Sequence, residues 1–242
     1  MRRAWLRCDG ALLIADPAGA LVWPERSLLV VADLHLEKAS ALARRGTLLP
    51  PYDTRSTLAR LETALRRWRP RRVISLGDGF HDGEGSVRLA PDDRARLERL
   101  IAAHDWLWLV GNHDPDPPQG LGGRVEAAVR IAGITLRHVP DRAPGGAEIA
   151  GHLHPCASVT VRGRRLHRRC FVGDERRLLL PAFGSYTGGL DVFDPAIAGL
   201  FDGGFRAALL GTRGVHPLPH HRLSRPGAHG LSERRGFIWS QA

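Results

Sequence analysis

The sequence contains few cysteines and no long apolar run. Its three cysteines are odd in number and show no CxxC spacing, which argues against a disulfide framework and favours reduced thiols in a cytoplasmic protein. No apolar stretch approaches the ~18 residues of a membrane span. The opening MRRAWLRCDG lacks the apolar core and the small-residue cleavage site of a secretory signal. We therefore predict a cytoplasmic protein that does not contact the membrane.

Lysine is almost absent, yet the chain is strongly basic. Lys38 is the single lysine, and the formal net charge is +10. A basic protein attracts polyanions such as nucleic acid. The arginines, however, accompany abundant alanine, glycine and proline, as GC-rich coding would produce. Charge alone leaves a nucleic-acid partner and a compositional bias as equal alternatives.

Apolar runs alternate with helical patterns in the first half of the chain. Residues 28–33, 71–78 and 106–114 are typical of strands that are covered on both faces. Residues 53–68 have leucines at helical spacing, and Pro91 occupies the first-turn position of another helix. This alternation indicates βαβ units and a parallel sheet.

Short strand patterns after residue 130 predict a second, mostly antiparallel sheet. The expected fold class is α/β, an α+β sandwich of two packed mixed β-sheets flanked by helices. We predict one domain over residues 1–210. Residues 211–242 lose periodicity and form a basic, His/Pro-rich stretch, predicted to be a flexible tail. Its histidines either bind metal or phosphate or are simply solvated.

Several predicted strands end in residues of the types that bind metals. These residues are Asp33, His35, Asp78, Asn112, His138, His152 and His154. Functional side chains of α/β proteins gather at the carboxyl ends of strands. Each residue taken singly is more typical of an ordinary turn or a core histidine. The ordered set D-x-H, GD, GNHD, H and GHxH nevertheless predicts one shared site.

The chemistry of this set suits two divalent ions. Carboxylate, imidazole and amide oxygen are ligands for Mn²⁺, Fe²⁺ or Zn²⁺, and the absence of thiolate argues against a structural zinc site. Two ions roughly 3.5–4 Å apart can clamp a phosphate and lower the pKa of a bridging water. Such a pair of ions can also stabilise both the attacking and the leaving oxygens of a phosphate.

The five blocks, all intact between residues 28 and 194, resemble the calcineurin-like metallophosphoesterases. The resemblance implies the metallophosphoesterase fold and in-line attack by a hydroxide that bridges the two metals. One metal would be held by Asp33, His35, Asp78 and His154, and the second by Asp78, Asn112, His138 and His152. His113 matches a histidine that binds the phosphate and assists the leaving oxygen, and Asp114 matches the acid that orients this histidine.

Two further stretches, ADLHLEKASALARRG (32–46) and LPAFGSYTGGLDV (180–192), are similar to the bacterial ligase-associated DNA damage response endonucleases of the PdeM group. This resemblance implies a Mn²⁺-dependent nuclease or phosphodiesterase that acts on DNA, single-stranded in preference to duplex. It also implies a link in DNA repair to an ATP-dependent DNA ligase and its associated helicase and exonuclease. A homodimer through the sheet edges is a further expectation.

Two other functions stay open at this point. One is a phosphoesterase for a nucleotide or another small phosphate ester. The other is an inactive scaffold on the same fold, against which the complete ligand set argues. Hydrolysis of a chromogenic phosphodiester and of single-stranded DNA would separate the three.

Substrate contacts are predicted at three places, each with a plainer alternative. Lys38 either meets a phosphate or pairs locally with Glu37. The run RGRRLHRR (162–169) either grips a DNA backbone or forms a solvated hairpin. Its candidate contacts are Arg162, Arg164 and Arg165. In AFGSYTGG, Tyr186 either stacks on a base or belongs to a loop whose glycines merely serve turns.

Overall fold

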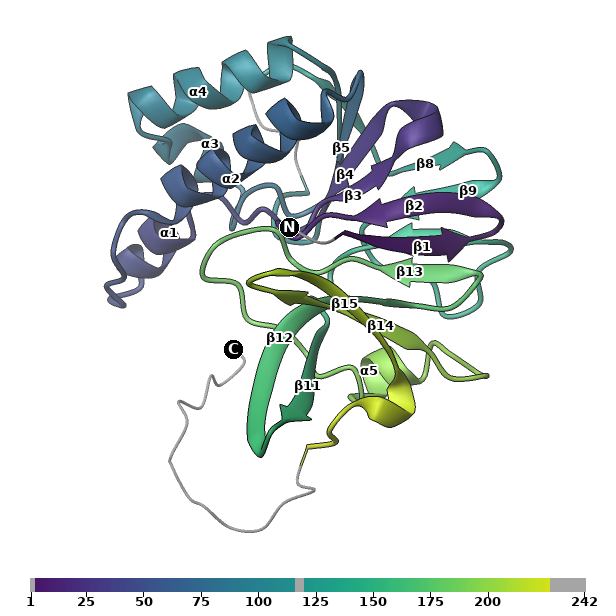
Figure 1. Ribbon diagram of the computed structural model, residues 1–242. Coiled ribbons are helices and arrows are strands. Elements are labelled where there is room, and N and C mark those ends of the chain that lie inside the picture. The colour runs from purple at the N-terminus through teal and green to yellow at the C-terminus, as the bar shows by residue number, and fades with distance from the viewer. Residues whose placement is uncertain (1–2, 116–119, 227–242) are drawn as a thin grey trace.

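The computed structural model describes residues 3–115 and 120–226, which form two β-sheets packed face to face (Figure 1). The first sheet has seven strands in chain order: β1 (Ala4–Cys8), β2 (Ala11–Ala15), β3 (Leu21–Trp23), β4 (Leu28–Val31), β5 (Arg72–Leu76), β6 (Asp105–Leu109) and β7 (Arg124–Glu126). Strands β1 to β4 are antiparallel, and β4 to β7 are parallel. The expected mixed sheet is confirmed.

The second sheet has the order β15-β14-β12-β13-β10-β9-β8, with β11 paired to β12. Its strands are β8 (Ala128–Ile131), β9 (Ile134–Arg137), β10 (Glu148–Ala150), β11 (Cys156–Val161), β12 (Arg164–Gly173), β13 (Arg177–Leu179), β14 (Arg206–Gly211) and β15 (Gly214–Pro219). Strands β9, β10 and β13 are mutually parallel, and the other pairs are antiparallel.

The helices cover the outer faces of the sheets. They are α1 (Lys38–Arg44), α2 (Asp53–Trp68), α3 (Gly85–Arg88), α4 (Pro91–Ala102) and α5 (Pro195–Ala198). Helices α1 to α4 group on the side of the first sheet, and α5 lies near β14 (Figure 1). Leu58 and Leu61 of α2 and Leu97 of α4 pack on the outer face of the first sheet. The predicted helices and βαβ order are confirmed. No helix of the described part could cross a membrane.

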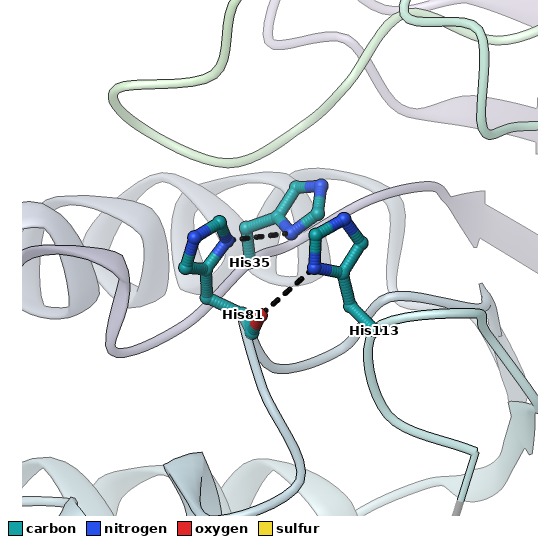
Figure 2. Close-up of side chains that lie close together, drawn as sticks. All are labelled: His35, His81 and His113. Atoms are coloured by element: carbon teal, nitrogen blue, oxygen red, sulfur yellow. Dashed lines mark hydrogen bonds between the residues drawn. The ribbon is translucent and has the colours of Figure 1, made fainter. Parts of the chain in front are cut away.

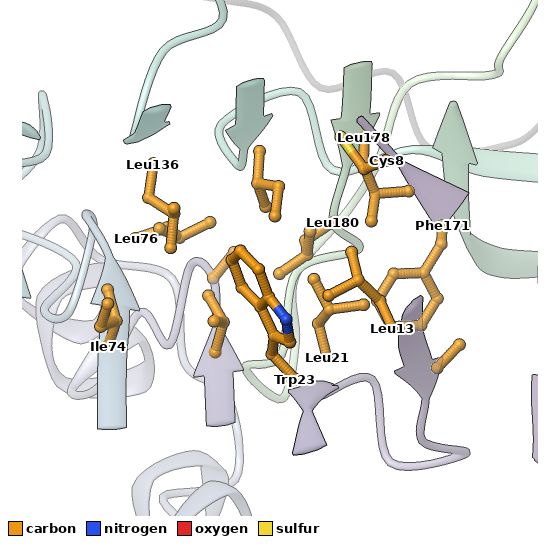
Figure 3. Packing of buried hydrophobic residues seen from close by; sticks show 14 of the residues in the cluster. Cys8, Leu13, Leu21, Trp23, Ile74, Leu76, Leu136, Phe171, Leu178 and Leu180 are labelled. Atoms are coloured by element: carbon orange, nitrogen blue, oxygen red, sulfur yellow. The ribbon is translucent and has the colours of Figure 1, made fainter. Parts of the chain in front are cut away.

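The main core lies between the two sheets (Figure 3). Trp23 and Leu76 of the first sheet face Leu136, Phe171 and Leu178 of the second. These side chains are at most 3% exposed. Full burial of one such side chain stabilises the fold by roughly 1.5–3 kcal/mol. This apolar contact fixes the two sheets together, so that loops at one edge of both sheets form a common surface.

The predicted boundary at residue 210/211 is wrong. Strand β15, which lies inside the predicted tail, pairs with β14 along its whole length. Its prolines, Pro217 and Pro219, are tolerated because β15 is an edge strand and needs ladder partners on one side only. Beyond it, the N–H of Ser224 donates to the carbonyl of Ser158. Residues 211–226 therefore belong to the domain, and the remainder of the predicted tail, residues 227–242, lies outside the described residues.

Candidate metal centre

Five parallel strands bring the predicted ligands to one edge of the molecule. Strands β4, β5 and β6 run in the same direction in the first sheet, as do β9 and β10 in the second. The residues that follow them are, in this order, Asp33 with His35, Asp78, Asn112 with His113 and Asp114, His138, and His152 with His154. All seven residues predicted to bind metal therefore converge.

The backbone at these strand ends is strained. Five of the residues have positive φ angles: Asp33 (54°), His35 (42°), Asp78 (45°), His152 (67°) and His154 (46°). A non-glycine residue in this region costs on the order of 1–3 kcal/mol, and such residues cluster at functional sites. The strand ends are thus bent in a way that directs carboxylates and imidazoles to a common point.

Asp33, His35 and His154 form a first group of potential ligands, with ligand atoms that all lie within 4.8 Å of one another. The Nε2 atom of His154 is 3.3 Å from the Oδ1 atom of Asp33. The Nε2 atoms of His35 and His154 are also 3.3 Å apart. Burial is the main cause that holds the pKa of His35 well below its usual range, and the neighbouring His154 is the second. The imidazole is therefore neutral, which is the form that binds metal.

Asp78, His138 and His152 form a second group. The Nε2 atom of His138 is 3.3 Å from the Oδ1 atom of Asp78 and 2.9 Å from the Oδ1 atom of Asn112. The other ring nitrogen, Nδ1, is 2.8 Å from the carbonyl oxygen of Leu76. An Nδ1–H that donates there leaves the Nε2 lone pair directed at the two oxygens. Three acceptor atoms then converge, as they do around a cation.

Asp78 lies between the two groups. Its Oδ2 atom is 3.7 Å from the Nε2 atom of His35, while its Oδ1 atom faces His138. The carboxylate also accepts a hydrogen bond from the N–H of His113. Burial opposes ionisation, but the contacts with His138, with the N–H of His113 and with His35 outweigh it and keep the pKa of Asp78 well below its usual range. A carboxylate in this place can serve both groups at once.

His113 stands at the exposed rim of the centre, and a residue that the sequence analysis missed lies beside it (Figure 2). The Nδ1 atom of His113 is 2.9 Å from the carbonyl oxygen of His81. The two rings stack with centroids 5.1 Å apart and planes inclined by 22°. His81 also approaches His35, with Nδ1 atoms 3.4 Å apart. The feature of the sequence that could have indicated His81 is its position three residues after Asp78.

The role expected for Asp114 is wrong in this structure. Its Oδ2 atom accepts a hydrogen bond of 2.9 Å from the N–H of Phe80, whereas His113 is held by the His81 carbonyl. The chain turns after Gly111 so that Asp114 points inward, where burial raises its pKa to about 7. Asp114 therefore supports the backbone of residues 79–80 and does not orient His113.

Gly111 allows the closest approach in the centre. A Cβ atom there would lie 2.1 Å from the backbone nitrogen of Asp78 and 2.2 Å from its Oδ1 atom. No other residue fits without displacing Asp78. The glycine before Asn112 is thus required by packing around the carboxylate that joins the two groups.

Lys38 lies near enough to the centre for its charge to act on His35 and His81. Burial lowers the pKa of His81 to about 4, and the positive charge of Lys38 is the second largest cause. The same charge contributes to the lowered pKa of His35. Glu37 does not pair with Lys38. Its carboxylate instead accepts hydrogen bonds from the hydroxyls of Ser40 and Thr54. Lys38 is therefore available for an anion beside the histidines.

The other predicted substrate contacts differ in position. Arg162, Arg164 and Arg165 are exposed at the tip of the β11–β12 hairpin. The tip is roughly 17 Å along β11 from the end that adjoins the centre. Tyr186 lies on the loop 183–190, whose backbone contacts the centre, and its side chain is 43% exposed. The structure brings Tyr186 near and leaves the three tip arginines apart.

One hollow of the described part of the molecule lies away from the predicted site. It has a volume of about 820 Å³ and runs along the edge strands β1 and β15, and none of its lining residues belongs to the predicted site. The candidate metal centre is thus defined by converging side chains and not by the size of a cavity.

Comparisons with known proteins agree with this geometry. The calcineurin-like phosphoesterase family profile matches residues 26–169. The chain belongs to this family, whose members use a dinuclear metal centre, and it is a hydrolase that acts on phosphoester bonds. No curated protein matches the sequence.

Among solved structures, the chain is similar to the nuclease MPE of Pseudomonas putida, at 31% identity and a TM-score of 0.69, over 90% of this chain and 100% of that chain. This similarity is consistent with the resemblance to the PdeM-type nucleases. The Escherichia coli phosphoesterase Yfce aligns at 14% identity and a TM-score of 0.39, over 79% of this chain and 98% of that chain, which is too distant to support an inference.

Proposed function

We propose that this protein is a Mn²⁺-dependent nuclease that hydrolyses phosphodiester bonds of DNA, single-stranded in preference to duplex. The observation that carries the proposal is the pair of ligand groups joined by Asp78, with His113 at their rim. The family and the similarity to a nuclease support the reaction class.

The donor set fits two divalent ions. Asp33, His35, Asp78 and His154 would hold one, and Asp78, Asn112, His138 and His152 the other. Asp33 and Asp78 are 0% and 1% exposed. Carboxylates that are buried to this extent need a positive charge beside them to remain ionised. Carboxylate, imidazole and amide oxygen without thiolate suit Mn²⁺, and Fe²⁺ or Zn²⁺ is compatible. When bound, such ions lower the pKa of a water and draw charge from phosphoryl oxygens.

His113 would act on the leaving oxygen. With its Nδ1–H donated to the His81 carbonyl, its Nε2 atom is directed away from that carbonyl and is available to a phosphate. Its ring centroid is 5.0 Å from that of His35. In the protonated form, Nε2 can donate to a phosphate oxygen and pass its proton to the departing alkoxide. Lys38 would add a positive charge on the same side, where a substrate phosphate needs it.

The depth at which the candidate metal centre is buried favours single-stranded DNA as the substrate. His35 and His138 are 3% exposed, so a scissile phosphate must enter below the rim on which His113 stands. A flexible strand can bend inward, whereas duplex DNA is stiff over ~150 base pairs and resists such bending. The two stretches that resemble the PdeM group support a place in DNA repair beside an ATP-dependent ligase and its associated helicase and exonuclease.

The test is cleavage of end-labelled single-stranded and duplex DNA in Mn²⁺ by the intact protein and by the Asn112→Ala and His113→Ala variants. We expect cutting of the single strand by the intact protein and a strong loss in both variants. Hydrolysis of bis(p-nitrophenyl) phosphate without any cutting of DNA would instead identify a phosphoesterase for small substrates.

A further inference from the structure

A basic hollow lies beside the metal centre, on the other side of the loop that carries Tyr186. Its volume is about 530 Å³, and it is lined by His167, Arg168 and Arg169 of β12, by Thr187 to Gly189 of the loop, and by the turns at Pro17 and at Gly211. None of the lining residues is an aspartate or glutamate. Positive charge without acid is the composition expected where a phosphate binds.

Strand directions place this hollow at the same edge as the metal centre. The carboxyl end of β4 lies beside the start of β3 and the end of β2, which leads into the Pro17 turn. In the second sheet, the ends of β10 and β13 lie together, and antiparallel pairing brings the β14–β15 turn to the same edge. The hollow and the centre therefore open at one edge of the two sheets.

One loop separates them and contacts both. The N–H of Gly184 donates to the carbonyl of Asp33 at 3.0 Å. A Cβ atom on Gly189 would lie 2.2 Å from the carbonyl oxygen of His154. Thr187 and Gly188, between these two contacts, line the hollow. A strand that leaves the centre across this short ridge thus arrives at the hollow.

The two arginines that line the hollow, Arg168 and Arg169, differ in their contacts and exposure. Arg169 is half-buried and donates to the carbonyl of Ala182 at 2.7 Å, so it fixes the start of the loop. Arg168 is exposed, and within the described residues it forms no ion pair, its one side-chain hydrogen bond being to the adjacent carbonyl of His167. Arg168 can therefore receive a phosphate without breaking any contact that holds the fold together.

We propose that this hollow is a subsite for a backbone phosphate of the DNA strand next to the scissile one, and that Arg168 binds it. This inference rests on the proposed nuclease function and deepens it. The subsite would distinguish a DNA strand from a small phosphodiester, because a small ester has no second phosphate to reach Arg168.

The test measures binding of a fluorescein-labelled oligothymidine by anisotropy across a salt series, in a His113→Ala background so that the probe is not cut. Arg168→Ala should weaken binding roughly tenfold and reduce the log–log salt slope by about 0.7. Arg168→Lys should retain the slope, since the charge remains. The matched control is Arg176→Ala, which removes an equal charge from an exposed position in the turn before β13, outside the lining of the hollow. It should change neither quantity.

Hydrolysis of bis(p-nitrophenyl) phosphate, measured with His113 intact, should be unchanged by Arg168→Ala. The subsite is overturned if Arg168→Ala binds DNA like Arg176→Ala, if the parent protein binds no oligonucleotide, or if Arg168→Ala impairs the small ester equally. Failure of the nuclease proposal is seen separately, as an absence of Mn²⁺-dependent cutting by the protein with His113 intact, and the binding series still decides the subsite.

Discussion

The Nδ1 atom of His113 lies 2.9 Å from the carbonyl oxygen of His81, and this hydrogen bond directs the other ring nitrogen away from the protein backbone. The contact uses a main-chain oxygen, so it survives most changes of side chain at residue 81. This arrangement leaves Nε2 as the ring nitrogen for the role proposed for His113, which is contact with the substrate phosphate.

His113→Ala should therefore reduce DNA cleavage by roughly 10²- to 10⁴-fold, which is the usual contribution of a general acid. Metal content should stay near two ions per chain, as measured by inductively coupled plasma mass spectrometry. Loss of both ions in this variant would refute the assigned role.

Asp114→Asn tests the corrected role of Asp114. Asparagine keeps an oxygen that can accept the hydrogen bond from the N–H of Phe80. Because Asp114 does not hold His113, turnover should remain within roughly threefold of the parent, well short of the loss expected for a general acid. A fall in turnover as large as that of His113→Ala, with metal content and melting temperature unchanged, would restore the original assignment.

Asp78→Ala should remove metal rather than impair one catalytic step. Asp78 faces His35 on one side and His138 on the other, so its loss weakens both ligand groups. We expect fewer than one bound ion per chain after dialysis and no DNA cleavage in Mn²⁺. A variant that retains two ions would show that Asp78 is not shared.

Gly111→Ala should destabilise the protein through a clash with Asp78. Overpacking of this kind typically costs 1–3 kcal/mol, about 2–4 °C of melting temperature for each kcal/mol in a chain of this size. Gly145→Ala is the control, because a Cβ atom there meets nothing within 4 Å. Equal melting temperatures for the two variants would contradict the packing described around Asp78.

The convergence of the predicted ligands could be anticipated because their position depends on strand direction. The apolar runs that become β4, β5 and β6 mark buried strands, and each strand is followed within three residues by a polar side chain. Parallel neighbours bring such ends to one edge, so convergence of Asp33, Asp78 and Asn112 follows from topology. The fold class followed in the same way from the alternation of strands and helices.

Other features depend on turns that the sequence does not specify. His81 reaches His35 because Leu36 pairs with Phe80 beyond the strand ends. Asp114 turns inward because of the path of the backbone after Gly111. Strand β15 was missed because prolines normally interrupt strands, and only its place at a sheet edge makes them acceptable.

The most direct test is anomalous diffraction from a crystal grown in Mn²⁺, recorded at the manganese absorption edge. We expect two peaks in each chain, one among Asp33, His35 and His154 and the other among Asp78, His138 and His152, with Asp78 in contact with both. A single peak, or peaks away from these side chains, would contradict it.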